Sequence, residues 1–259
     1  MSNIILPHLL DNLESLKNQE DKIRTDSSLL INSQEILRKH INLIYISMDM
    51  LMWMHGRTVN LESDRLIAIA GLRIRLFNST SCSLKLLLSG YYQGAVSFIR
   101  DILEVSFLLD YFTLDETAIE RWVKNPDINE FKSVNVRTIL DSRNGLSEQK
   151  RRQKYKLLCT YGAHATFDGN KLFSNNNLLT IGPFFNQKFL ENILFELTLL
   201  QPHPTLSLMR YESNLSIEDL QTKKEFFTTI QSWWKININS NFCDEEINEI
   251  NQVFKLLGL

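Results

Sequence analysis

Apolar residues recur at steps of three and four along most of this 259-residue chain, which is the spacing of one face of an α-helix. Asp26, Ser27 and Ser28 are N-cap candidates for a long helix that follows a short amphipathic element at 9–16, and Gly56 would end that helix. Its apolar face consists of Leu37, Ile41, Ile44, Met48, Leu51 and Met54.

The helical pattern continues through the middle of the chain. Ser63 or Asp64 begins a helix that ends at Gly90, and the next helix begins at Tyr91. Because the connection is so short, we expect these two helices to be antiparallel. Shorter helices are predicted after Asp115, over 133–142 and from Ser147 to about 164, with a tight turn at 144–145.

The periodicity disappears over 165–182. The segment KLFSNNNLLTIGP favours a small β-hairpin near 171–181, with residues 175–177 in the turn. Helical spacing returns after Pro183, is interrupted at Pro202 and Pro204, and continues in helices that open at Ser216 and Asp244. We therefore predict an all-α multi-helix bundle over 1–259 as a single domain, with C-terminal helices at 205–259 packed on it.

The composition is that of an ordinary soluble globular protein, with 44% hydrophobic and 22% charged residues. A net charge of -2 gives no global reason to expect nucleic acid, although a local basic site stays open. Cys82, Cys159 and Cys243 are scattered, as expected for the reduced thiols of a cytoplasmic protein. Residues 1–10 lack the basic start of a signal peptide, so none is expected.

The most informative helix is the apolar segment at 91–112, which carries Arg100 and Glu104 one turn apart on one face. Charges in its middle argue against a membrane span. A charge on a buried face needs a partner. Either the two form a structural ion pair, which we favour, or they line a site where the guanidinium binds an anion and the carboxylate orients it or acts as a base. Their expected buried neighbours are Val96, Phe107, Leu108 and Tyr111.

A dense basic run opens the helix predicted from Ser147. With two tyrosines interleaved it could hold phosphates and stack a base, or it could be a solvated helix face. His164 ends that helix and could act as a general acid or base, bind an anion, or cap the helix. The run comprises Lys150, Arg151, Arg152, Lys154 and Lys156, with Tyr155 and Tyr161 between and after them.

The other histidines show no spacing typical of metal ligands, and His203, between two prolines, is expected in a loop. Phosphate-binding glycine motifs and nucleophile elbows are absent from the sequence. We therefore predict neither a metal site nor a cofactor.

The segment GYYQGAVSFIRDILE, followed some fifty residues later by YKLLCTYGAH, resembles bacterial helical proteins related to the HEPN superfamily. The matching positions are Gly90, Arg100, Glu104, Tyr155 and His164, and the resemblance covers about 84–200. It implies a HEPN-like core at about 60–200.

The resemblance also implies a helical bundle, often dimeric, and for many members ribonuclease activity in toxin–antitoxin or antiphage systems. Their active sites use an Arg and a His little more than one turn apart on one helix. Here Leu and Cys occupy the corresponding places ahead of His164, and Arg152 lies about three turns away. The usual motif is therefore absent, and Arg100 could join His164 only across the bundle.

Three functions stay open. The first is a HEPN-like protein of a bacterial stress or phage-defence system that binds RNA or nucleotide, with Arg100, Glu104 and His164 as the candidate catalytic residues near one pocket. The second is a non-catalytic scaffold with a structural Arg100–Glu104 pair, acting through a second copy or a partner protein. The third is a small-molecule enzyme whose Arg100 binds a carboxylate or phosphate. None of these involves a membrane.

Overall fold

The computed structural model of the chain describes residues 9–57, 63–125, 129–146, 149–175, 178–239 and 243–256. Across these ranges the elements are helices, apart from one two-stranded sheet, which confirms the predicted all-α bundle with a small hairpin. Within the same ranges, no helix combines the length and apolarity needed to cross a bilayer. Residues 1–8, which carry much of the expectation about a signal peptide, lie outside them.

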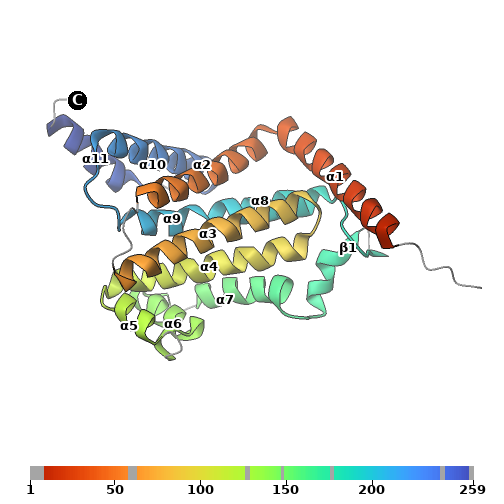
Figure 1. The fold of residues 1–259 in the computed structure, drawn as a ribbon, viewed down its shortest axis with the longest axis horizontal. Helices are drawn as coiled ribbons and strands as arrows, with labels where there is room; N and C mark the ends of the chain where they lie inside the picture. The colour runs from red at the N-terminus through yellow and green to blue at the C-terminus, as the bar shows by residue number, and fades with distance from the viewer. Residues whose placement is uncertain are drawn as a thin grey trace, which may run out of the picture.

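The elements follow one another along the chain as Figure 1 shows. The long N-terminal helices are α1 (Leu9–Ser33), α2 (Glu35–Arg57), α3 (Asp64–Leu88) and α4 (Tyr92–Leu114). Shorter elements follow: α5 (Ala118–Lys124), the 3-10 turn η1 (Asn129–Phe131), α6 (Ser133–Arg143), α7 (Lys150–Leu158), the π-helical turn η2 (Cys159–Ala163) and the 3-10 helix η3 (Asp168–Phe173). The chain continues through β1 (Ser174–Asn175), β2 (Leu178–Leu179), α8 (Gln187–Leu200), α9 (Pro202–Met209), α10 (Ile217–Asn237) and α11 (Asp244–Leu256).

Helix α4 lies at the centre of the bundle. It packs on α3, its antiparallel neighbour, and also contacts α6, α7, α8 and α9 (Figure 1). A helix that is apolar around most of its circumference is buried on most sides, which explains this position. Helices α2, α10 and α11 cover the opposite side of α8 and α9, and α1 extends from the far end of α2.

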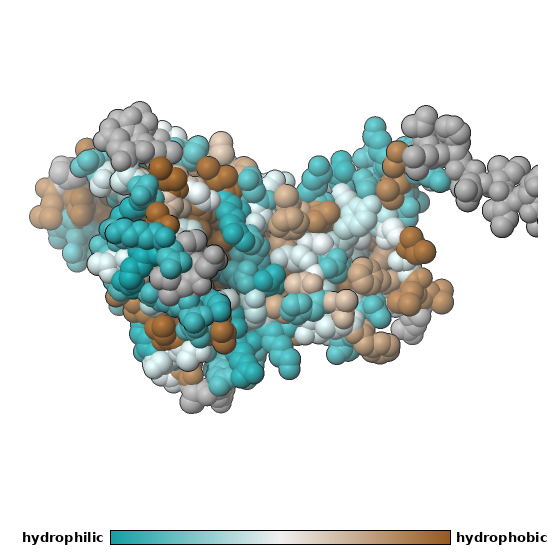
Figure 2. Space-filling model, turned by 60° about the horizontal axis from the view of Figure 1, so that its bottom comes forward, coloured by the Kyte–Doolittle hydropathy of each residue, from teal (hydrophilic) through white to brown (hydrophobic). Residues whose placement is uncertain are grey.

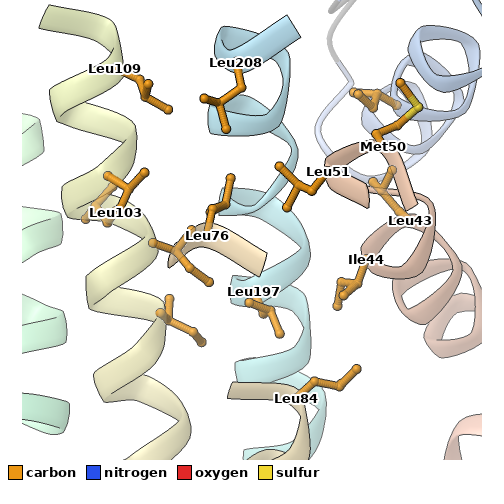
Figure 3. Packing of buried hydrophobic residues seen from close by; sticks show 14 of the residues in the cluster. Leu43, Ile44, Met50, Leu51, Leu76, Leu84, Leu103, Leu109, Leu197 and Leu208 are labelled. Atoms are coloured by element: carbon orange, nitrogen blue, oxygen red, sulfur yellow. The ribbon is translucent and has the colours of Figure 1, made fainter. Parts of the chain in front are cut away.

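The core is formed by apolar side chains that converge from α2, α3, α4, α8 and α9 (Figure 3). Leu76 of α3 lies beside Leu103 of α4, and Leu197 of α8 continues the same layer toward α2. On α2 the predicted face is confirmed, because Leu37, Ile44, Leu51 and Met54 are buried while Ile41 and Met48 pack partly buried against them.

Several predicted helix ends are confirmed by their capping contacts. The Ser63 hydroxyl accepts from the Leu66 amide at 3.3 Å, and Ser216 forms a capping box with Asp219. Gly90 ends α3 with a φ of 85°, and a Cβ there would lie 2.5 Å from the Phe184 carbonyl oxygen. Only glycine fits that left-handed turn and close approach.

The predicted N-terminal boundary is wrong. Residues 26–28 lie inside α1, which is one continuous helix, and the chain breaks instead at Gln34. The hydroxyl of Ser28 donates to the carbonyl of Arg24 one turn earlier, so it does not cap a new helix. Burial of Ile23 and Ile31 keeps α1 helical across the supposed boundary.

The predicted hairpin is formed by β1 and β2. Asn175 pairs with Leu178, and the expected turn residues 176–177 lie outside the described residues, as does the helix start predicted at Ser147.

The prediction that His203 lies in a loop is wrong, because His203 belongs to α9. Pro202 occupies the first turn of that helix, where its missing N–H breaks no helical hydrogen bond. The His203 Nε2 lies 2.8 Å from the Asp110 carboxylate.

His40 is a buried titratable group in this core. Its ring lies 5.6 Å from that of Phe195 and 5.5 Å from that of Trp233, and its Nδ1 accepts the Trp233 indole N–H at 2.8 Å. Burial lowers the pKa of His40 to about 4. The folded protein therefore holds a neutral imidazole at neutral pH.

Between about pH 6.5 and pH 4 the unfolded chain binds a proton at His40 that the folded protein does not. The free energy of unfolding should therefore fall as the pH is lowered through this window, by up to about 3 kcal/mol from this group. Urea unfolding at pH 7.5 and pH 4.5 measures the loss. The His40→Asn variant keeps an acceptor for Trp233 without titrating, so it should lose less; equal losses in both proteins would contradict the assignment.

Candidate functional site

Arg100 and Glu104 form the ion pair that their spacing suggested. The Arg100 Nη2 lies 2.7 Å from the Glu104 Oε1, and both side chains come from α4. Their neighbours Val96, Phe107 and Tyr111 are buried, but the two charged side chains remain 28% and 25% exposed. The pair is thus half-buried at the edge of the core and not sealed inside it.

Tyr155 of α7 completes this cluster. Its hydroxyl donates to the Glu104 Oε1 at 2.6 Å and accepts from the Arg100 Nη2 at 3.1 Å and Nε at 3.3 Å. Burial works against the charge on Arg100, but Tyr155 and Glu104 outweigh it and raise the Arg100 pKa. Burial and the hydrogen bond to Glu104 also raise the pKa of Tyr155. The tyrosine therefore keeps its proton and donates it to the carboxylate.

Arg137 of α6, which no sequence pattern singles out, also contacts this cluster. Its guanidinium carbon lies 3.9 Å from the centroid of the Tyr155 ring, and its side chain is almost completely buried. A cation on an aromatic face at this distance is attracted by the ring. Only the packing of α6 against α7 brings the two residues together, so no sequence spacing could have revealed the contact.

The basic run of α7 divides into two parts, and the first part holds the helix in place. Arg151 pairs with Asp141 of α6 at 2.8 Å, and Lys154 pairs with Glu196 of α8. These two side chains therefore hold α7 against its neighbours, and their charges are already paired.

The second part faces solvent. Lys150, Arg152 and Lys156 are exposed and have no carboxylate partner within the ranges that the structure describes. Arg152 donates to the Gln149 side-chain oxygen at 2.7 Å. We call these three residues the α7 cationic face.

Tyr161 and His164 lie beyond the end of α7. Gly162 in the η2 turn approaches α4 so closely that Ser97 and Gln93 both donate to its carbonyl oxygen. Tyr161 packs partly buried against the core. The next residue after the turn, His164, has an extended backbone and an exposed side chain, and among the described residues its imidazole makes no hydrogen bond.

The structure therefore brings together Arg100, Glu104 and Tyr155, and leaves His164 outside that cluster. The partner that sequence analysis proposed for Arg100 across the bundle is replaced by the Tyr155 hydroxyl. Over the described part of the chain, no three His, Cys, Asp or Glu side chains gather in a way that could hold a metal ion.

The close approach of Gly162 to α4 gives a direct test. A Cβ at this position would lie 2.8 Å from the Ser97 amide nitrogen and 2.9 Å from the Val96 carbonyl carbon, both backbone atoms. Gly162→Ala should therefore lower the free energy of unfolding by about 2 kcal/mol or more. Gly71→Ala is the matched control, because nothing lies within 4 Å of its added Cβ and alanine favours the helix. Equal midpoints in urea for the two variants would argue against the close approach.

A second test concerns the charged cluster. Arg100→Ala removes a donor from both Glu104 and Tyr155, and should lower the free energy of unfolding by about 1–2 kcal/mol, since solvent reaches the orphaned carboxylate in part. Arg75→Ala is the control, because Arg75 of α3 pairs with Asp101 of α4 but is 59% exposed, so its loss should cost less than about 1 kcal/mol. A larger loss for Arg75→Ala in thermal or urea unfolding would refute this ranking.

Comparisons of the chain with protein-family models, curated proteins and solved structures find no match. A relationship to HEPN proteins therefore stays a prediction from the sequence.

Proposed function

We propose that this protein is a HEPN-like RNA-binding protein of a bacterial stress or phage-defence system. In this proposal the α7 cationic face binds RNA phosphates, and the protein does not cleave the RNA. The observation that carries this proposal is that the basic run contains two kinds of cation. Some are paired with a carboxylate of a neighbouring helix, and the others are free of such a partner among the described residues. Lys150, Arg152 and Lys156 are the free ones, and all three are exposed in a chain whose net charge is negative.

The geometry of α7 suits this role. Arg152 and Lys156 are one helical turn apart and so lie on the same side of the helix. The ion pairs of Arg151 and Lys154, together with the Tyr155 hydrogen bonds, hold the helix against α4, α6 and α8. Figure 2 brings this side of the molecule forward, and toward the end with α5 and α6 it shows mainly hydrophilic side chains with small hydrophobic patches between them.

The charged cluster favours binding over catalysis. Arg100 and Glu104 are hydrogen-bonded to each other and to Tyr155, whose hydroxyl already donates its hydrogen bond to Glu104. A general base needs a free acceptor within reach of the substrate, and His164 lies outside the cluster. We therefore assign the cluster the role of positioning α7.

The test is the affinity for a fluorescein-labelled single-stranded RNA, measured by anisotropy at several salt concentrations. The double variant Lys150→Gln/Lys156→Gln should bind several-fold more weakly, and the slope of log K against log salt should become shallower by about 1.4 units, since each phosphate contact to a single strand contributes about 0.7. The double variant Lys17→Gln/Lys22→Gln removes the same charge from exposed positions of α1 and should bind like the wild type.

Equal affinity in both double variants would reject the α7 cationic face and favour the scaffold alternative. The wild-type protein should leave the RNA intact after prolonged incubation without added metal. Cleavage that disappears in His164→Ala would instead establish a ribonuclease.

A further inference from the structure

Arg137 is a buried cation that has no counter-ion among the residues the structure describes. Its side chain is 7% exposed, its Nη1 donates to the Ser133 hydroxyl at 2.5 Å, and its Nε donates to no atom. No carboxylate of the described residues pairs with it. Arg73, which is 3% exposed, has Glu212 at 2.6 Å. A buried guanidinium normally has such a partner, because removing an unpaired charge from water is costly.

The unpaired guanidinium lines a cavity between α6 and the start of α7. The cavity has a volume of about 430 Å³, and its wall includes Arg137, Asp141, Ser142, Gln149 and Arg152. This volume falls in the range of small-molecule sites, roughly 300–1,000 Å³. Unlike most of those sites, however, its wall is rich in polar and charged groups.

The charges around this cavity favour an anion. Arg137 and Arg152 contribute two guanidinium groups, and among the described lining residues the one carboxylate, that of Asp141, is already paired with Arg151 at 2.8 Å. Arg152 also orients Gln149, because its Nη1 donates to the Gln149 Oε1 and leaves the amide N–H groups of that side chain as donors. The Ser142 hydroxyl supplies a further donor at the wall.

We infer that this cavity binds a phosphate monoester, with Arg137 and Arg152 holding the phosphate group. Guanidinium groups match phosphate oxygens with paired N–H donors, and two of them balance the two charges of a monoester. Tyr155 supports the site from behind, because Arg137 stacks on its ring. The phosphate could come from a free mononucleotide or from the 5′ end of RNA, and only the second source rests on the proposed function.

Calorimetric titration with AMP and with adenosine tests the site. The wild type should bind AMP and show no measurable affinity for adenosine. Arg152→Gln should weaken AMP binding about tenfold or more, which corresponds to the loss of one charge-assisted contact. Arg143→Gln removes the same charge from an exposed position at the end of α6 that does not line the cavity, and should stay within about twofold of the wild type.

Because Arg137 is buried, its replacement could unfold the protein, so Arg137→Lys is compared with the wild type only after circular dichroism shows the same helix content. It keeps the charge but loses the paired donors, and should also bind AMP about tenfold more weakly. Failure of the wild type to bind either AMP or inorganic phosphate, or wild-type affinity for AMP in Arg152→Gln, would overturn the inference.

Oligoribonucleotides of one sequence, with and without a 5′ phosphate, separate the two sources. Tighter binding of the phosphorylated form, lost in Arg152→Gln, would support the RNA end as the ligand. AMP binding without a preference for the 5′-phosphorylated oligoribonucleotide would support a free nucleotide as the ligand. That result would support the cavity as a phosphate site even if RNA did not bind to the α7 cationic face. RNA binding with no AMP or phosphate binding would reject the cavity while the proposed function stood.

Discussion

The hydrogen bonds between α7 and the charged pair of the central helix α4 are made by one hydroxyl group. The Tyr155 hydroxyl lies between a guanidinium and a carboxylate of α4, accepting from Arg100 and donating to Glu104. The ring that carries this hydroxyl also receives Arg137 from α6 on its face. One side chain therefore joins three helices, and it does so at the edge of the core where water still reaches the ion pair. The free cations and the cavity beside α7 both owe their placement to this junction.

The central helix makes that junction feasible. Helix α4 is buried on most of its circumference, so its few polar groups are confined to the lines where neighbours cross it. Arg100 and Glu104 meet α7 there, Ser97 meets the η2 turn one turn earlier, and Asp101 meets Arg75 of α3. Each of these polar groups thus has a defined partner on another element or within its own pair.

Much of the fold follows from local sequence. Three- and four-residue spacing with caps at Ser63, Ser216 and Gly90 places most helices, because these signals act within a single turn. The same signals failed at 26–28, where burial of residues on both sides outweighed capping propensity. The Arg100–Glu104 pair was predictable because both residues share one helix. Tyr155 was named only as a binding residue, and Arg137 was missed, because their contacts depend on how separate helices pack.

The η2 turn has a structural consequence of its own. The His164 amide donates to the Cys159 carbonyl five residues earlier, so the coil holds one residue more than an α-helix would use for the same bond. Each residue advances an α-helix by about 100°. The chain that leaves the η2 turn is therefore rotated by about 100° about the helix axis, relative to a regular continuation of α7. A deletion of one residue at this point would restore the regular phase and redirect the following chain, so the length of this segment, as much as its chemistry, sets where the imidazole lies.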